Sequence, residues 1–412
     1  IGVIMKRIVV LVILSGIIWI SGIKQIKAQD SVTKGFTTTQ NIANSMLHSN
    51  RKLNIGGYAQ VDYNQAFGNN THYNGKLDVH RLVLLFGYRF TDKLSFVTEI
   101  EIEHVKEVYV EQAFLNYALN TYVNFRGGLI LIPMGIINEY HEPPTFNGVE
   151  RPLIDKYIAP TTWREIGLGV TGTIPEISLR YQAYLVNGFK SYQSGEAFIS
   201  GENGLRRGRQ KGAESFITFP NFSAKIEFYG LLGLNLGLST YVGKTQSTLY
   251  KNIDKGNELM VASADSSVVG VSMIGFDVRY NRKGFEFRGQ LYYTSLSNTE
   301  QYNYRTATDD KLNDVGSSMH GYYAEVAYDV FYPFQKLKGQ LVPFIRYSNF
   351  DTQSSVAIDD IKNEAYSYSV ITTGIGYWFI QQVAVKTDIQ FIKSKADDKF
   401  SNVFNAGIAV MF

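Results

Sequence analysis

The 412-residue chain has no cysteine. This absence excludes disulfide bonds, thiolate metal sites, a cysteine nucleophile and a lipid-modified cysteine anchor. Neither sign of charge is in excess, because 40 Lys and Arg residues stand against 37 Asp and Glu residues. A bulk electrostatic affinity for nucleic acid is therefore not expected. Long apolar runs are scarce as well, since no second one follows Ile8–Ile20.

That single apolar run follows Lys6 and Arg7 and is followed by the more polar stretch Lys27–Asp30. A positive start, a short apolar core and a small residue near the end are typical of a secretory signal peptide. We expect residues 1–29 to be this signal peptide, cleaved near Ala28 or Gln29. An uncleaved membrane anchor is the alternative. Residues 30–54 then form a periplasmic lead-in segment, and 55–412 form the folded domain.

Aromatic residues and glycine are abundant, with 28 Tyr, 26 Phe and 37 Gly, although only 45% of the chain is hydrophobic. A transmembrane β-barrel explains this combination. Its strands alternate between lipid-facing and lumen-facing residues, so the average hydropathy is moderate, while aromatic residues gather at the two membrane interfaces.

From Ile55 onward, apolar and polar residues alternate with period two, in segments of the length that crosses an outer membrane. In one segment Leu82 and Leu84 point outward and Arg81 points inward, and the next one carries Glu99, Glu101 and Glu103 on its inner face. The sequence predicts an all-β fold, a transmembrane antiparallel β-barrel of about sixteen strands. The predicted strands are 55–66, 78–90, 94–103, 107–119, 122–132, 166–174, 177–187, 215–229, 233–243, 267–280, 285–296, 319–331, 340–350, 366–378, 382–393 and 400–412.

The connections between these strands alternate between short and long, as periplasmic turns and external loops do in outer-membrane barrels. One external connection, near Val105–Lys106, is too short for this pattern. It is either a tight hairpin or a misplaced strand boundary.

The last predicted strand ends on Phe412, with Phe404, Ile408 and Val410 on the same face. In a closed barrel this strand pairs with the first one and leaves no free edge. A final amphipathic strand ending in Phe also resembles the signal by which bacterial outer-membrane barrels engage the barrel assembly machinery. The expected location is the outer membrane of a Gram-negative bacterium.

The longest connection, 133–165, is the third external loop. Its five prolines restrict the backbone, and Ile136, Tyr140 and Phe146 provide apolar surface. Long loops with packing residues of their own are usually functional, and a barrel of this size has a bore that wall side chains alone do not fill. We expect this loop to fold inward and to set the aperture.

Two stretches resemble the phosphate-selective porins O and P, in the form common among Bacteroidetes-type bacteria. The first is Asn124–Gly128 together with Pro133–Gly135, and the second is the hairpin Ala224–Tyr229 with Gly233–Ser239. The resemblance covers 55–412 and implies a trimeric channel of sixteen strands for small anionic solutes.

Anion selectivity requires basic residues along the path. The same lumen holds carboxylates, however, including Glu99, Glu227 and Asp388. The mixture predicts weak selectivity. The basic cluster 206–211 in the fourth external loop is a further candidate for gathering anions at the channel mouth. The favoured interpretation is a solvated loop or one that binds lipopolysaccharide phosphates. The candidate pore-lining residues are Arg81, Arg126, Glu139, Glu150, Arg151, Lys156 and Arg164.

We therefore predict an outer-membrane porin, a passive channel for small hydrophilic solutes with a preference for anions or phosphate. No enzyme activity, cofactor or metal is predicted, because the six histidines lack metal-ligand spacing and no nucleophile motif is present. The expected partners are the solutes, outer-membrane lipid with lipopolysaccharide, and two further copies in a homotrimer. Two alternatives stay open: a plugged binding or structural barrel, such as an adhesin or complex subunit, and a surface hydrolase.

Overall fold

The computed structural model describes residues 41–68, 72–309, 311–334 and 336–412. All of them belong to one compact unit, Gly35–Phe412. The predicted signal peptide, 1–29, and the first part of the lead-in segment lie outside the described residues.

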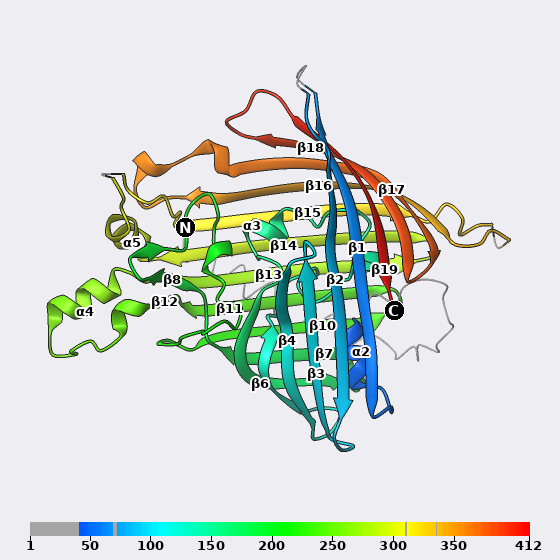
Figure 1. The fold of residues 1–412 in the computed structure, drawn as a ribbon, viewed down its shortest axis with the longest axis horizontal. Helices are drawn as coiled ribbons and strands as arrows, with labels where there is room; N and C mark the ends of the chain where they lie inside the picture. Colours follow the sequence, from blue (N-terminus) through cyan, green and yellow to red (C-terminus); the bar gives the residue numbers. More distant parts are fainter. Residues whose placement is uncertain (1–40, 69–71, 310, 335) are drawn as a thin grey trace. The chain divides into compact units, whose positions relative to one another are not determined.

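Sixteen antiparallel strands form one closed barrel, in which each strand pairs with its neighbour along the chain and β1 pairs with β19 (Figure 1). The predicted fold class and strand number are confirmed. The largest boundary error is in β10, which starts later than predicted. The barrel strands are β1 (Leu53–Phe67), β2 (Lys76–Arg89), β3 (Leu94–Glu103), β4 (Glu107–Ala118), β5 (Asn124–Leu131), β6 (Arg164–Ile174), β7 (Leu179–Val186), β10 (Asn221–Leu231), β11 (Leu234–Lys244), β13 (Gly270–Arg282), β14 (Phe285–Ser297), β15 (Ser318–Tyr328), β16 (Gln340–Ser355), β17 (Ser367–Ile380), β18 (Val383–Ser394) and β19 (Ser401–Met411).

The two faces of the strands differ as the period-two pattern predicts. In β1, Tyr58, Gln60 and Asp62 are buried inside, whereas Ile55 and Val61 are exposed outside. The same alternation places a belt of large apolar side chains around the exterior, which suits contact with lipid. This belt includes Ile226, Leu238, Phe276, Leu291, Ile345 and Ile408.

The terminal strands close the barrel. Phe412 N donates a hydrogen bond to Gly57 O at 2.8 Å, and Gly57 N donates to Phe412 O at 2.9 Å. Further along, Val61 pairs with Ile408. The chain therefore leaves no free edge between β1 and β19, and the side chain of Phe412 stays exposed on the outside.

The short connection between β3 and β4 is a tight hairpin, and not the result of a misplaced strand boundary. His104 and Val105 have φ angles of 54° and 66°. Two consecutive residues with positive φ are typical of a type I′ turn, whose twist matches that of paired strands.

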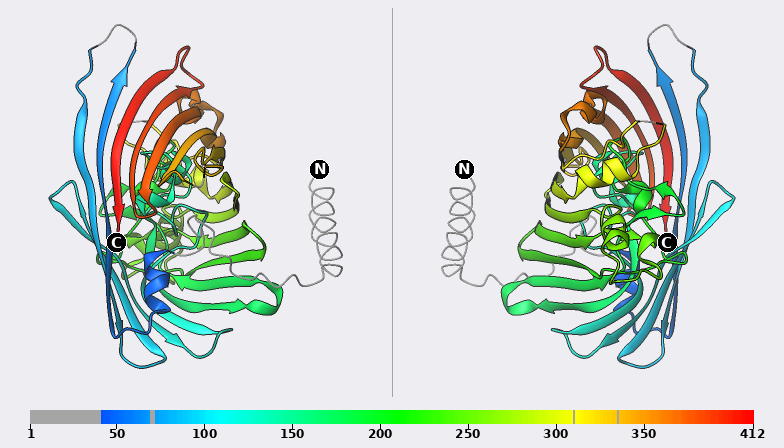
Figure 2. Two further views of the ribbon diagram at one scale, coloured as in Figure 1. Left: turned by 90° about the vertical axis from the view of Figure 1, so that its right-hand side faces the viewer. Right: turned by 90° about the vertical axis from the view of Figure 1, so that its left-hand side faces the viewer.

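The third external loop, here called loop three (132–163), lies inside the barrel between β5 and β6 (Figure 2). It contains the short helices η1 (Pro143–Thr145) and α3 (Ile154–Tyr157). Ile132, Phe146 and Trp163 are completely buried. The predicted inward fold is confirmed, and its cause is apolar surface that only the lumen buries.

The remaining elements lie in the lead-in segment, the turns and the external loops. Strands from loop four (187–220) and the following external loop form a small separate sheet, β12-β8-β9. Helix α2 in the lead-in contacts β1, β2 and β3. These elements are α2 (Ile42–Leu47), η2 (Pro175–Ile177), β8 (Lys190–Gln193), β9 (Glu196–Ala197), η3 (Arg206–Gly208), β12 (Gln246–Ser247), η4 (Thr248–Tyr250), α4 (Glu258–Asp265), α5 (Thr299–Arg305), η5 (Asp359–Ile361) and η6 (Glu364–Tyr366).

Candidate functional site

An open cavity of about 440 Å³ lies between the inner wall of β1–β4, loop three and loop four. Seven of its lining residues are basic and three are acidic. The basic residues are Arg81, Arg151, Lys156, Arg164, Arg206, Arg209 and Lys211, and the acidic ones are Glu101, Glu103 and Glu150.

A β-bulge shapes the wall of this cavity. Gln60 pairs with Arg81 but Asp62 pairs with Asp78, so β2 contains one extra residue at this point. The bulge allows the neighbours His80 and Arg81 to line the same cavity. Strict alternation places His80 on the lipid side, and the structure corrects that interpretation.

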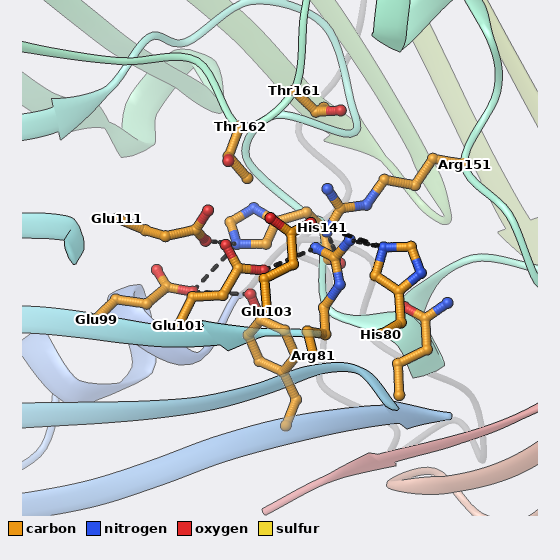
Figure 3. Close-up of polar contacts among 12 residues, drawn as sticks. His80, Arg81, Glu99, Glu101, Glu103, Glu111, His141, Arg151, Thr161 and Thr162 are labelled. Carbon is orange, nitrogen blue, oxygen red and sulfur yellow. Dashed lines mark hydrogen bonds and ion pairs between the residues drawn. The ribbon is translucent and has the colours of Figure 1, made fainter. Parts of the chain in front are cut away.

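The strand side of the cavity pairs its charges internally. Arg81 Nη1 lies 3.4 Å from Glu101 Oε1, and Arg81 Nη2 donates to His80 Nε2 at 2.7 Å. His80 Nδ1 lies 3.1 Å from Asp62 Oδ2. The contacts of Arg81 with Glu101 and His80 are drawn in Figure 3. With the contact to Asp62 they pair the charged groups on this side of the cavity.

The loop side of the cavity carries positive charge that is not neutralised. Within the described ranges, no carboxylate oxygen lies within 4.0 Å of the cationic groups of Arg151, Lys156, Arg206, Arg209 or Lys211. Burial and, to a smaller extent, repulsion from Arg206 lower the pKa of Arg209 to about 9. Burial and, to a smaller extent, repulsion from Arg209 also lower the pKa of Lys211. The guanidinium of Arg209 remains cationic at neutral pH, so the loop side has a positive potential.

The barrel wall holds loop three by hydrogen bonds to its backbone. Lys386 Nζ donates to Phe146 O at 2.6 Å and to Gly148 O at 3.0 Å. On the same strand, Asp388 Oδ2 accepts from Val149 N at 2.7 Å. The polar residues of the inner wall therefore satisfy buried loop groups that water does not reach, and this fixes the position of the cavity-lining segment.

A second buried cluster joins loop three to β3 and β4 beside the cavity (Figure 3). His141 Nε2 lies 3.2 Å from Glu99 Oε1 and 3.6 Å from Glu111 Oε2. Burial alone lowers the pKa of His141, but the two carboxylates outweigh it and raise this pKa to about 9. The partners of His141 are carboxylates, the Asn138 carbonyl and the Tyr58 ring.

The structure brings five of the seven candidate pore-lining residues together around the cavity. These are Arg81, Glu150, Arg151, Lys156 and Arg164.

Arg126 and Glu139 do not line the cavity. Arg126 stacks on the Phe114 ring at 4.5 Å and donates to Tyr184 Oη. Glu139 accepts from Lys225 Nζ at 2.6 Å and from Gln182 Nε2 at 2.5 Å. Both side chains bind wall residues elsewhere in the lumen.

Loop four supplies cavity residues from the basic cluster that the sequence interpretation favoured as solvated. Arg206, Arg209 and Lys211 line the cavity, whereas Arg207 remains exposed. Arg206 Nη1 and Arg209 Nη1 both donate to Thr161 O. The interpretation of this cluster as a solvated loop was wrong for these three residues. A run of charges alone does not reveal that its loop folds over loop three.

The chain is similar to an uncharacterized protein of Aquifex aeolicus, with 34% identity over 383 residues, which are 90% of this chain and 82% of the relative. Its fold is similar to that of the outer membrane channel DcaP of Acinetobacter baumannii, with 12% identity, a TM-score of 0.57, and coverage of 87% of this chain and 97% of the other. The anion-selective porin from Comamonas acidovorans is also similar, with 13% identity, a TM-score of 0.54, and coverage of 87% and 99%. No model of a known protein family matches the chain.

These likenesses agree with the porin-type fold but leave the phosphate-selective family unassigned. In the described part of the chain, no helix is long and apolar enough to cross a membrane. The sixteen strands satisfy their backbone groups by closing on themselves, and they carry an apolar belt outside. Closed barrels of this kind span the outer membrane of Gram-negative bacteria, and the protein is located there.

Proposed function

Because this chain belongs to the same protein family as the Aquifex aeolicus protein and spans the outer membrane as a closed barrel, we propose that it is a passive channel for small hydrophilic solutes, with a preference for anions. The channel performs no chemistry and needs no cofactor. Solutes enter from the external side, where loops three and four surround the cavity.

The unpaired cations of the loop side carry this proposal. A low-dielectric wall focuses the field of such charges into the aqueous path and raises the local concentration of anions. The carboxylates Glu101 and Glu103 on the opposite side, and Glu150 on loop three, reduce the preference. We therefore expect moderate selectivity, with phosphate as one of several anions that pass.

The assembly is part of the same proposal. We expect a homotrimer in outer-membrane lipid with lipopolysaccharide, and insertion by the barrel assembly machinery through the strand that ends at Phe412. Chemical cross-linking of the purified protein measures the oligomer directly, and a monomer alone contradicts the trimer.

Planar-bilayer recording tests the channel. We expect stepwise currents, and a reversal potential in a potassium chloride gradient that indicates anion preference. The double variant Arg151→Gln, Lys156→Gln should shift this potential toward cation preference, because it removes two unpaired charges. Lys336→Gln, Lys338→Gln is the matched control, since it removes two exposed charges from the connection between β15 and β16, away from the cavity, and it should leave the potential unchanged. Absence of stepwise current refutes the proposal.

A plugged barrel is the second candidate. Loop three lies inside the lumen, and the N-terminal end of α2 is hydrogen-bonded to it. Ile42 N donates to Glu142 Oε1 at 2.9 Å, and Asn41 Nδ2 donates to Glu139 O at 2.7 Å. If this second candidate is right, the full chain shows no conductance, and a variant that lacks residues 41–48 conducts.

A further inference from the structure

Two clusters in the described residues bring a histidine and two carboxylates close enough to share one cation. They are Asp62, His80 and Glu150, and Glu99, Glu111 and His141. In each cluster one ligand atom per residue lies within 4.8 Å of the others. The hydrogen bonds of the two histidines show which of the two clusters can bind a cation.

His80 has no nitrogen free for a metal. An arginine N–H only donates, so Nε2 of His80 accepts from Arg81 Nη2 and its Nδ1 must carry the proton. That N–H faces Asp62 Oδ2 at 3.1 Å. Both nitrogens are occupied, and the first cluster is an ordinary hydrogen-bonded pair.

His141 is arranged in the opposite way. Its Nδ1 lies 3.2 Å from the carbonyl oxygen of Asn138, which only accepts, so Nδ1 carries the proton. Its Nε2 faces Glu99 Oε1 and Glu111 Oε2, which are acceptors as well. Metal-binding histidines almost always donate their other ring N–H to a carbonyl or carboxylate in this manner. Either a proton or a metal ion must lie between Nε2 and the two oxygens.

The distances favour the metal. A charge-assisted N–H···O bond is about 2.7–2.9 Å long, but the two distances from Nε2 are 3.2 Å and 3.6 Å. In a tetrahedron around zinc with bonds of about 2.1 Å, neighbouring ligand atoms are about 3.4 Å apart. Both distances from Nε2 are close to this separation between neighbouring ligand atoms.

A β-bulge brings Glu111 to this position. Glu99 pairs with Gln112, whereas Ile100 pairs with Val110, so Glu111 is the extra residue of β4. Glu111 and Gln112 are consequently both buried inside. Within the described part of the chain, Glu111 Oε2 has no hydrogen-bond partner although it is completely buried. A buried carboxylate oxygen without a donor is costly unless a cation fills the place.

The surrounding residues orient the ligands. Glu99 Oε1 accepts from Tyr58 Oη at 2.9 Å, and Glu99 Oε2 accepts from Gln112 Nε2 at 2.6 Å. Arg164 Nη1 lies 3.4 Å from the other oxygen of Glu111. Two carboxylates and a neutral imidazole around a divalent cation have no net charge, which suits complete burial.

We propose that Glu99, Glu111 and His141 bind one divalent transition cation of the zinc type, which ties loop three to β3 and β4. The mixed nitrogen and oxygen ligands suit zinc better than calcium, which takes 6–8 oxygens. This site does not depend on the channel activity, since binding is measured without transport.

The test is zinc binding by calorimetry to the full chain, purified in detergent and stripped with a chelator. We expect one Zn²⁺ per chain and no comparable binding of Ca²⁺. His141→Gln and Glu111→Gln should each weaken binding at least about tenfold, and Tyr58→Phe, which removes only an orienting donor, about tenfold. His80→Gln, in the rejected cluster, should leave binding unchanged.

Zinc-edge X-ray absorption of the wild-type protein checks the ligands without any variant and should show one imidazole and carboxylate oxygens. Failure of the stripped wild-type chain to bind zinc overturns the site and assigns the cluster to a protonated His141. Equal binding by His141→Gln, or its loss in His80→Gln, overturns it too. Circular dichroism confirms that each variant keeps its strand content.

Discussion

At the scale of single residues, the lumen holds many buried ionisable groups that pair with each other and with the backbone of loop three. Lys225 illustrates this: its Nζ donates to Gly135 O at 2.7 Å and lies 3.3 Å from Asp277 Oδ2. Such groups hold loop three because breaking one contact leaves a buried partner unpaired. Among the residues that the structure describes, the cations on the loop side of the cavity have no such carboxylate partner, and the proposed solute preference rests on them.

Asp155 gives a prediction about pH. Burial raises its pKa to about 7, although Gln290 and Tyr292 donate to its Oδ1. An unfolded Asp has a pKa of about 3.9. Between these values the folded chain holds a proton that the unfolded chain releases, so this contribution to stability falls as the pH rises from about 4 to 7.

Asp155→Asn mimics the neutral acid and should stabilise the protein at pH 8 by about 1–3 kcal/mol, with no gain at pH 4. Thermal unfolding at both pH values measures this. Asp92→Asn, at a fully exposed turn position, serves as the control and should have no effect at either pH. An equal gain at both pH values for Asp155→Asn contradicts the explanation.

At the scale of elements, irregularities define the site. Two β-bulges, in β2 and β4, turn His80 and Glu111 into the lumen. The hairpin at His104–Val105 keeps the external ends of β3 and β4 short beside the cavity. Regular strands alone would point these side chains elsewhere.

The hairpin gives a prediction about stability. Val105 is β-branched and has a φ of 66°. A left-handed conformation costs an L-residue about 1–2 kcal/mol, and glycine loses about 0.5–1 kcal/mol in chain entropy. Val105→Gly should therefore stabilise the barrel by about 0.5–1 kcal/mol in urea unfolding. Lys106→Gly, next in the same turn but without positive φ, should give no gain.

At the scale of the whole molecule, the barrel is a cylinder with an apolar exterior and a packed polar interior. The exterior belt fixes its depth in the membrane, and the interior positions the loops. Leu291 lies halfway along β14 (Phe285–Ser297), and about half of its side chain is exposed.

Leu291→Arg should destabilise the folded barrel in lipid vesicles by about 2–4 kcal/mol, because it places a charge near the bilayer midplane. Phe285→Arg, at the end of the same strand, should cost only about 0–1 kcal/mol. Equilibrium unfolding from vesicles measures both. Equal costs at the two positions would mean that the belt does not lie at the membrane centre.

The strand number and the closure of the barrel were predictable, because apolar and polar residues alternate within each strand and distinguish its lipid side from its lumen side. Leu82 and Arg81 show the lipid and lumen sides of β2 without any knowledge of their neighbours. Loop three was recognisable by its length and prolines. Of the site, Arg151 and Lys156 were found because a loop that folds inward must bring its charges with it.

The rest depended on tertiary structure. Glu99, Glu111 and His141 have no metal-ligand spacing in the sequence, because a strand pair and a loop bring them together in space. Arg209 reaches the cavity only because loop four folds over Thr161. Local alternation determined the cylinder, whereas contacts between residues far apart in the chain, and single-residue bulges that break the alternation, decided what its lumen holds.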